Sequence, residues 1–154
     1  MKYRIRKIED EDEARSLYNL VFPTNTWALD GHEYWVVKDE AGEVAGFCSA
    51  VYWPTLDTVF LSSCAVTMAA RGKGLQRRMI DIRVKWGRKS GARYAFTYVA
   101  VGSYASLSNL LGKGFRGVWR PSSTFPAHVL YKTLDCYWWP NAAEISEIAW
   151  HMLN

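Results

Sequence analysis

A glycine-rich basic turn is the part of the sequence whose residue types could do chemistry. The turn, RGKG at residues 71–74, follows the apolar segment 58–66 and precedes an amphipathic segment that begins at Leu75. Glycines let a backbone approach a ligand closely, and the first-turn amides of a helix attract anions. The glycine spacing matches neither the phosphate loop of nucleotide hydrolases nor the dinucleotide-binding fingerprint. The turn therefore predicts a phosphate or pyrophosphate site, with a plain surface turn as the alternative.

The apolar pattern along the chain predicts the elements that position this turn. Apolar runs or alternation predict strands over residues 3–8, 34–38, 44–53, 58–66, 94–101, 115–120 and 127–134. Apolar spacings of three and four predict helices over residues 9–22, 75–90, 103–113 and from 141 onward. This order indicates one α+β domain with a mixed, mostly antiparallel sheet of six to seven strands flanked by helices. We place the domain at residues 1–134. Residues 135–154 form a C-terminal extension, with one helix packed on the domain or on a second subunit.

Two segments resemble the acetyl-CoA-binding motifs of the GNAT superfamily of N-acetyltransferases. The first, AVTMAARGKGLQRRMI at residues 65–80, is similar to a strand ending in Val, then (Q/R)-x-x-G-x-(G/A) and an apolar helix face. Ala69 stands where the family usually has Gln or Arg. The second, SYASLSNLLGKGFR at residues 103–116, resembles the family's N-x-x-S and N-L-L-x-x-GF pattern, with Ser103 in place of Asn. The resemblance spans residues 1–134 and implies a single GNAT-like domain.

The same resemblance implies how acetyl-CoA is held. The strand 58–66 is expected to diverge from the strand 94–101, so that the pantetheine arm enters between them and pairs with the end of the first strand. The pyrophosphate is expected on the amides that follow the turn, and the helix of the second motif adds further contacts. The implied cofactor-binding residues are Ala65, Val66, Thr67, Arg71, Gly72, Lys73, Gly74, Leu75, Gln76, Ser103, Ser106 and Asn109.

The resemblance also implies the reaction, which is direct transfer of the acetyl group from acetyl-CoA to a primary amine. Such an enzyme orients the reactants and accepts the amine's proton. Many relatives use a Glu on the motif strand as the base, whereas this chain has Ser62, Ser63 and Cys64 there. We assign Ser63 as the catalytic residue, with a water chain to carry the proton. Candidates for the far end of that chain, each with a structural role as the alternative, are His32, Glu33, Asp57 and His128.

The donor to the leaving thiolate departs from the family pattern as well. Many relatives have a Tyr on the second motif helix, and Leu110 stands at that position here. We assign Tyr104 as the donor, whereas Tyr98 is expected in the core. Cys64 is expected as a small buried residue, because no His is recognisably paired with it. Since the usual Glu and Tyr are missing, the alternative function is a non-catalytic CoA-binding or nucleic-acid-associated protein of the same fold.

The helix after the turn is strongly basic, and Asp81 is the only acid between residues 71 and 93. The charges fit a solvated helix face whose first turn attracts the cofactor phosphates. The minority interpretation is a nucleic-acid surface. That surface would use Arg83, Arg88 and Lys89, which lie too far along the helix to serve the cofactor.

Composition sets the class of protein. The chain has 154 residues, of which 49% are hydrophobic and 22% charged, as in a globular domain. The net charge of +4 favours anionic ligands without choosing among them. The three cysteines suggest neither a disulfide framework nor a zinc site, so no metal is expected. Without a signal-like or membrane-spanning apolar run, we expect a cytoplasmic protein with no membrane partner. Its acceptor is a small-molecule or protein amine, and a homodimer remains open.

Overall fold

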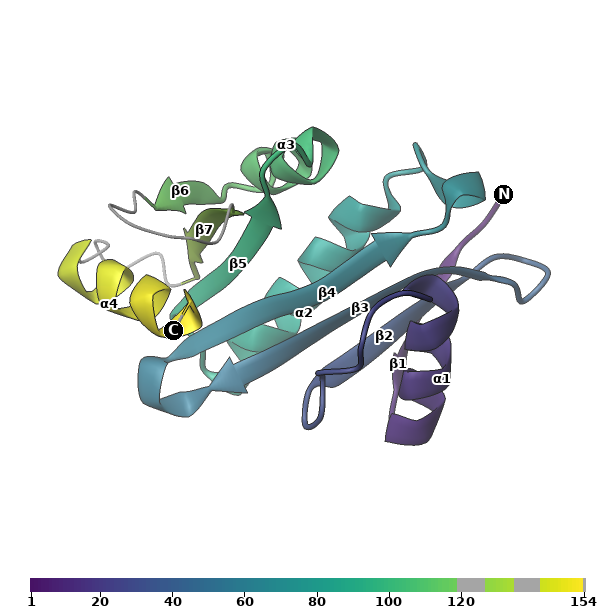
Figure 1. The fold of residues 1–154 in the computed structure, drawn as a ribbon, viewed down its shortest axis with the longest axis horizontal. Coiled ribbons are helices and arrows are strands. Elements are labelled where there is room, and N and C mark those ends of the chain that lie inside the picture. The colour runs from purple at the N-terminus through teal and green to yellow at the C-terminus, as the bar shows by residue number, and fades with distance from the viewer. Residues whose placement is uncertain (119–126, 135–141, 154) are drawn as a thin grey trace. The chain divides into compact units, whose positions relative to one another are not determined.

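A seven-stranded sheet is the framework of the protein, whose computed structural model describes residues 1–118, 127–134 and 142–153. The strand order is β1-β2-β3-β4-β5-β7-β6 (Figure 1). Strands β4 and β5 are parallel, with Thr58 opposite Tyr94, whereas β1/β2, β2/β3, β5/β7 and β6/β7 are antiparallel. The mixed, mostly antiparallel sheet that the sequence predicts is confirmed.

The elements follow one another along the chain in the expected order, with two short 3-10 turns added. Their bounds are β1 Arg4–Ile8, α1 Glu11–Val21, β2 Glu33–Lys38, β3 Val44–Trp53, η1 Pro54–Leu56, β4 Thr58–Val66, η2 Met68–Ala70, α2 Leu75–Ser90, β5 Tyr94–Ala100, α3 Tyr104–Gly112, β6 Arg116–Val118, β7 Ala127–Thr133 and α4 Ala142–Leu153. The last two residues of the predicted strand 115–120, and the predicted helix start at residue 141, lie outside the described residues. No described helix combines the length and apolar character needed to cross a membrane.

The chain forms two compact units, and strands β3 and β4 and helix α2 contribute residues to both. The first unit comprises Met1–Val51 and Leu61–Arg83, and the second comprises Tyr52–Phe60 and Val84–Asn154. Each unit has its own core. The proposed boundary at residue 134 adjoins residues 135–141, which lie outside the described residues, and it stays a prediction.

An aromatic core holds the first unit together. Tyr18 of α1 meets Phe47 of β3 edge to face at a centroid distance of 5.8 Å, and both rings are buried. Ile8, Tyr34 and Val36 complete the same cluster from β1 and β2. Because β2 and β3 pair in register beneath these side chains, the core also fixes residues that follow Phe47 along β3.

The core of the second unit lies between α4 and strands β5 and β7. Ile145 and Ile148 of α4 are buried against Tyr94, Phe96 and Val129. The Tyr94 hydroxyl donates to Glu144 of the same helix at 2.9 Å. The described part of the C-terminal extension therefore packs on its own chain.

Candidate active site

The turn before α2 has a backbone that suits glycine. Gly72 and Gly74 have φ angles of +75° and +73°, in the left-handed region that other residues rarely adopt. A Cβ built on either glycine would meet nothing within 4 Å. The glycines are therefore required by the path of the chain, and the space beside them is open.

The start of α2 is arranged to bind an anion. The first hydrogen bond into the helix runs from the amide of Arg78 to the carbonyl of Gly74, at 3.2 Å. Amides ahead of this bond belong to the first turn, where N–H groups point out of the helix. The first turn carries no acidic residue. The exposed cations around it are Arg71, Lys73, Arg77 and Arg78. Leu75, which begins the helix, anchors it because its side chain is buried in the first unit.

The backbone groups at the end of β4 differ in whether they are directed to β3. The amide of Thr67 donates to the carbonyl of Ala45 at 2.9 Å, so this amide is committed to β3. The carbonyl of Ala65 approaches Gly46 so closely that a Cβ there would lie 2.9 Å from it. Backbone groups alternate between the two edges of a strand. Of the three residues predicted to pair with the pantetheine arm, Val66 is therefore the one whose amide and carbonyl are expected to face away from β3.

A chain of hydrogen bonds joins three side chains of the first unit beside β4. His32 Nδ1 lies 2.9 Å from the Ser62 hydroxyl oxygen, and that oxygen lies 2.6 Å from the hydroxyl of Ser49. The backbone amide of Ser63 donates to the Ser49 hydroxyl at 3.1 Å. Ser49 is fully buried, whereas His32 and Ser62 are half-buried. The chain therefore leads from a hydroxyl that a ligand could reach to an imidazole that could hold a proton.

The serine in this chain is Ser62 rather than the predicted Ser63. Successive side chains of a strand point to opposite faces, so only one of two neighbouring serines can face Ser49. Ser63 takes part through its backbone amide. Its assignment as the catalytic hydroxyl stays a prediction that no contact supports. The sequence could have indicated that Ser49 and Ser62 lie opposite each other, because they are equally far from the turn that joins the two strands.

Among the candidates for the far end of a proton chain, His32 lies beside the serines. Glu33 pairs instead with Lys7 at 2.9 Å. Asp57 belongs to the second unit, where its carboxylate lies 3.9 Å from Arg93. Burial lowers the pKa of His32, and the nearby charge of Asp30 opposes that shift. His32 is therefore neutral at neutral pH and able to accept a proton.

Arg83 overturns part of the nucleic-acid interpretation. Its side chain is 3% exposed, and its guanidinium donates to the carbonyls of Met79 at 3.0 Å and Ser49 at 3.2 Å. A buried arginine cannot contact a nucleic acid, so the predicted surface loses one of its three residues. The long aliphatic stem of arginine explains the error, because it packs like an apolar side chain.

The thiols of Cys48 on β3 and Cys64 on β4 are unreactive. Burial raises the pKa of Cys48 to about 12, although the charge of Arg83 opposes the shift. Burial likewise raises the pKa of Cys64. Both cysteines are free thiols that stay protonated at neutral pH, which argues against a nucleophilic role.

The residues predicted on the second motif belong to the second unit. Ser103 precedes α3 and its carbonyl accepts from the amide of Leu107 at 3.0 Å, while its side chain is exposed. Tyr104 is 74% exposed. Ser106 and Asn109 are half-buried on the same helix. The prediction that Tyr98 is a core residue is wrong, because this ring is 43% exposed and stacks on Phe60 at 5.7 Å.

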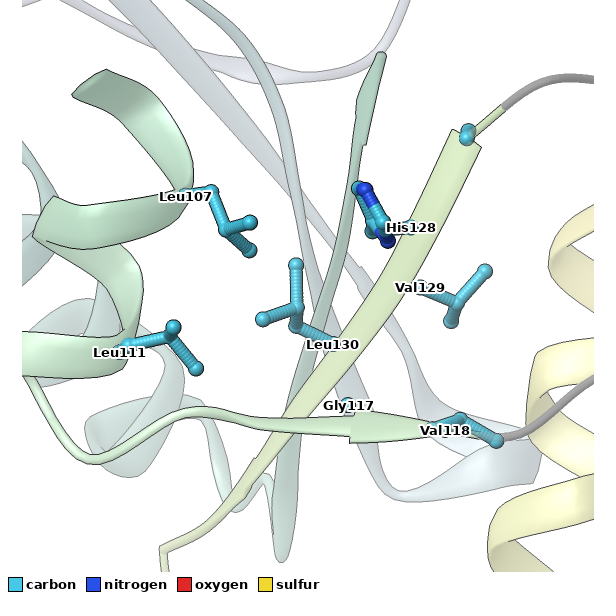
Figure 2. A pocket seen from close by; sticks show the side chains of 8 residues that line it. Leu107, Leu111, Gly117, Val118, His128, Val129 and Leu130 are labelled. Carbon is cyan, nitrogen blue, oxygen red and sulfur yellow. The ribbon is translucent and has the colours of Figure 1, made fainter. Parts of the chain in front are cut away.

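A hollow of about 280 Å³ lies between α3 and strands β6 and β7 (Figure 2). Leu130 of β7 points toward Leu107 and Leu111 of α3, and the other lining side chains include Val118 and Val129. The single titratable side chain of this lining is His128, which is exposed. This apolar hollow offers no pair of groups for acid–base chemistry. Elsewhere in the described ranges, no three His, Cys, Asp or Glu residues gather as metal ligands.

The first unit thus presents an acid-free helix start with exposed cations and a hydroxyl–imidazole chain, and comparison with known proteins identifies the family. Residues 3–109 match the Acetyltransferase (GNAT) family. The chain belongs to the GNAT acetyltransferase family. A search of the curated proteins returns no match.

Solved structures carry the same fold as this GNAT chain. An acetyltransferase of Bacillus subtilis in complex with CoA has a TM-score of 0.68 and 21% identity, covering 86% of this chain and 99% of its own. A Salmonella typhimurium acetyltransferase with its cofactor acetyl-CoA has a TM-score of 0.67 and 20% identity, covering 91% and 98%. The ribosomal-protein-S18-alanine N-acetyltransferase of Escherichia coli has a TM-score of 0.67 and 15% identity, covering 87% and 95%.

Proposed function

We propose that this GNAT chain is an N-acetyltransferase that moves the acetyl group of acetyl-CoA to a primary amine by direct transfer. The observation that carries the proposal is the start of α2, where exposed cations and left-handed glycines surround first-turn amides. Such a start suits a diphosphate, the charged part of CoA. The similarity to acetyltransferase structures with CoA and acetyl-CoA supports the choice of ligand.

The residues present fit the cofactor. Arg71 and Lys73 would supply positive charge, and the amides from Gly72 to Gln76 would bind the pyrophosphate. Their surroundings leave room, because no atom lies within 4 Å of a Cβ built on either glycine of the turn. Val66 would pair with the pantetheine arm through backbone groups that face away from β3. Ser103, Ser106 and Asn109 of the second unit are proposed as further contacts.

When bound, acetyl-CoA supplies a thioester whose carbonyl carbon an amine can attack. The protein has to hold the amine against that carbon, accept a proton from the amine and donate one to the departing sulfur. The exposed Tyr104 is proposed as the donor. No carboxylate lies on β4, so hydroxyl groups are proposed to pass on the amine's proton.

The acceptor is proposed as a small-molecule or protein amine. Similarity to a ribosomal-protein-alanine acetyltransferase supports a protein acceptor, and similarity to a spermidine N-acetyltransferase supports a small one. The free thiols of Cys48 and Cys64 suit a reducing compartment, so we propose a cytoplasmic enzyme. A homodimer remains a prediction.

Titration calorimetry with acetyl-CoA tests the cofactor site. A Gly72→Asp, Gly74→Asp variant puts two carboxylates into the turn and strains its left-handed backbone, so we expect affinity to fall by about 100-fold or more. The matched control is Gly42→Asp, because Gly42 has a φ of +83° and open space around its Cβ but lies in the β2–β3 turn. The control should bind as the wild type does. A folded wild-type protein that does not bind acetyl-CoA contradicts the proposal.

Release of the free thiol of CoA separates catalysis from binding. With acetyl-CoA and a panel of small and protein amines, the proposal predicts thiol release that depends on one class of amine. The alternative, a non-catalytic CoA-binding protein, predicts binding without release for every amine.

A further inference from the structure

We propose that Ser62, backed by His32 and Ser49, takes the proton from the acceptor amine. This inference rests on the proposed acetyl transfer. A hydroxyl–imidazole chain takes the role of the carboxylate that β4 lacks. Ser62 is the group that would touch the amine. His32 and Ser49 act through it.

One donor of the chain is fixed, because a backbone amide can only donate. The amide of Ser63 donates to the Ser49 oxygen at 3.1 Å. Because the Ser49 oxygen keeps a second lone pair, either hydroxyl could donate across the 2.6 Å between Ser49 and Ser62, and the proposed chain takes Ser49 as the donor. The hydrogen of Ser62 then points to His32 Nδ1 at 2.9 Å. In this arrangement Nδ1 is an acceptor, so neutral His32 carries its hydrogen on Nε2.

This arrangement prepares Ser62 for an amine. A serine oxygen has two lone pairs and one hydrogen. The hydrogen is directed to His32 and one lone pair accepts from Ser49, which leaves the second lone pair to accept an N–H of the incoming amine. A hydroxyl of ordinary pKa is a poor base, but here its own hydrogen can leave toward an imidazole as the new one arrives.

The proton balance is complete. As an ammonium acceptor gives its first proton to the Ser62 oxygen, the hydrogen of Ser62 passes to His32 Nδ1, which becomes an imidazolium. The freed nitrogen lone pair forms the bond to the acetyl carbon, and the carbon–sulfur electron pair leaves with the sulfur. The sulfur takes a proton from the proposed donor Tyr104, the second amine proton replaces that proton on Tyr104, and His32 later returns its own proton to water.

The charges around His32 keep it available as an acceptor. Half-burial lowers its pKa, with Asp30 as the opposing charge. Asp30 is engaged by the Trp27 ring N–H at 2.6 Å and by Arg15 at 3.2 Å. The other acids nearby are also engaged, Glu33 by Lys7 at 2.9 Å and Glu11 by Arg15 at 3.5 Å. No full counter-charge therefore holds His32 as an imidazolium.

The chain is held in place by buried contacts. Ser49 has no exposed surface, and its carbonyl accepts from the buried guanidinium of Arg83 at 3.2 Å. These contacts fix the Ser49 hydroxyl and, through it, the orientation of Ser62. Ser49 is therefore a positioning residue.

The first test is the pH dependence of kcat at saturating amine in three variants. In the wild type, kcat should fall as the pH drops through the pKa of His32, which lies below its ordinary value of about 6.5. His32→Asn keeps a hydrogen-bond acceptor near Nδ1 but cannot hold a proton. Both His32→Asn and Ser62→Ala should lower kcat by about 100-fold and remove the acidic limb, which is the fall of kcat at low pH. Ser49→Ala should lower kcat about 10-fold and retain the limb, since the imidazole remains.

Two matched substitutions should leave both kcat and its pH profile unchanged. Ser16→Ala removes a hydroxyl that donates to the carbonyl of Asp12 within α1, and His151→Gln removes a half-exposed imidazole of α4. If the kcat of His32→Asn still falls at acidic pH, the proposed proton chain is wrong, although the proposed acetyl transfer stands.

The second test needs neither cofactor nor turnover. Nitrogen-15 NMR of the imidazole should show, at neutral pH, an Nε2–H tautomer with an unprotonated Nδ1 that accepts a hydrogen bond. Ser62→Ala should shift the Nδ1 resonance, whereas Ser16→Ala should not. An Nδ1–H tautomer, or an Nδ1 resonance indifferent to Ser62→Ala, overturns the chain whatever the activity. If the wild type shows the expected resonances but releases no CoA with any amine, the proposed function is wrong. The role of the hydroxyl–imidazole chain in that function is then wrong as well.

Discussion

Helices α1 and α2 begin in opposite ways. The side chain of Asp10 caps α1 by accepting the amide of Asp12 at 3.2 Å, and the first turn of that helix is acidic throughout. The first turn of α2 has no acid, and exposed arginines and lysines surround it instead. The N-terminal end of any helix carries partial positive charge that favours an anion. Helix α1 supplies that anion from its own sequence, whereas the first turn of α2 supplies none, as the proposed cofactor site requires.

The difference separates a structural helix start from a binding one. Acids and a capping side chain stabilise α1 whether or not a ligand is present. Cations and left-handed glycines at α2 stabilise the helix less and bind an external anion more. If this interpretation is right, changes at the two starts should affect different quantities, stability at α1 and affinity at α2.

The largest effect is expected from reversing the charge of the α2 turn. Arg71→Glu with Lys73→Glu should weaken acetyl-CoA binding about 100-fold, or about 2.7 kcal/mol, because two attractive charges become repulsive. Both side chains are exposed, so the thermal midpoint should stay within about 2 °C of the wild type. Calorimetry and thermal unfolding measure the two quantities.

The matched control reverses the same residue types at the other end of the same helix. Arg88→Glu with Lys89→Glu changes the net charge equally, and both residues are exposed in the last turn of α2. Affinity for acetyl-CoA should then stay within about twofold. A comparable loss in both pairs would mean that net charge governs binding, which would remove the special role of the helix start.

Much of the fold could be predicted from the sequence because apolar pattern and turn residues agree. Strands β3 and β4 have their predicted bounds, 44–53 and 58–66, since Pro54 and its neighbours interrupt an otherwise continuous apolar run. The pattern failed where a side chain's type does not decide its burial. Arg83 is buried because carbonyl groups satisfy its guanidinium, and Tyr98 is exposed although its strand is apolar.

The site was predictable in one part and not in the other. The turn proposed to bind the cofactor phosphates is contiguous, so its glycines and cations can be recognised in the sequence. The hydroxyl chain joins residues 32, 49 and 62, which only the paired strands bring together. The predicted Ser63 lies one position from Ser62, and a shift of one residue along a strand exchanges its two faces. No periodic pattern places His32, because it lies in the segment before β2.

A smaller effect is expected at the cap of α1. Asp10→Ala removes the side chain that accepts the amide of Asp12, so the free energy of unfolding should fall by about 1 kcal/mol. Acetyl-CoA affinity should not change. Urea denaturation and calorimetry provide the measurements, and Glu9→Ala is the control, since its largely exposed carboxylate should matter by less than about 0.5 kcal/mol. An Asp10→Ala variant that binds acetyl-CoA more weakly would contradict the division between the two helix starts.

The smallest effect, and the one that tests the comparison most directly, is expected from giving α2 an acid of the kind that α1 has. Arg77→Glu places a carboxylate in the first turn of α2, where it should stabilise the helix by about 0.5 kcal/mol. The same carboxylate should compete with the cofactor phosphates and weaken acetyl-CoA binding several-fold, so stability and affinity should move in opposite directions. Arg77→Gln is the matched variant, because it removes the cation without adding an acid. It should lower affinity less than Arg77→Glu does and raise stability by a smaller amount. Urea denaturation and calorimetry on the same samples decide the matter, and a loss of both stability and affinity in Arg77→Glu would show that the start of α2 is not held open for an anion.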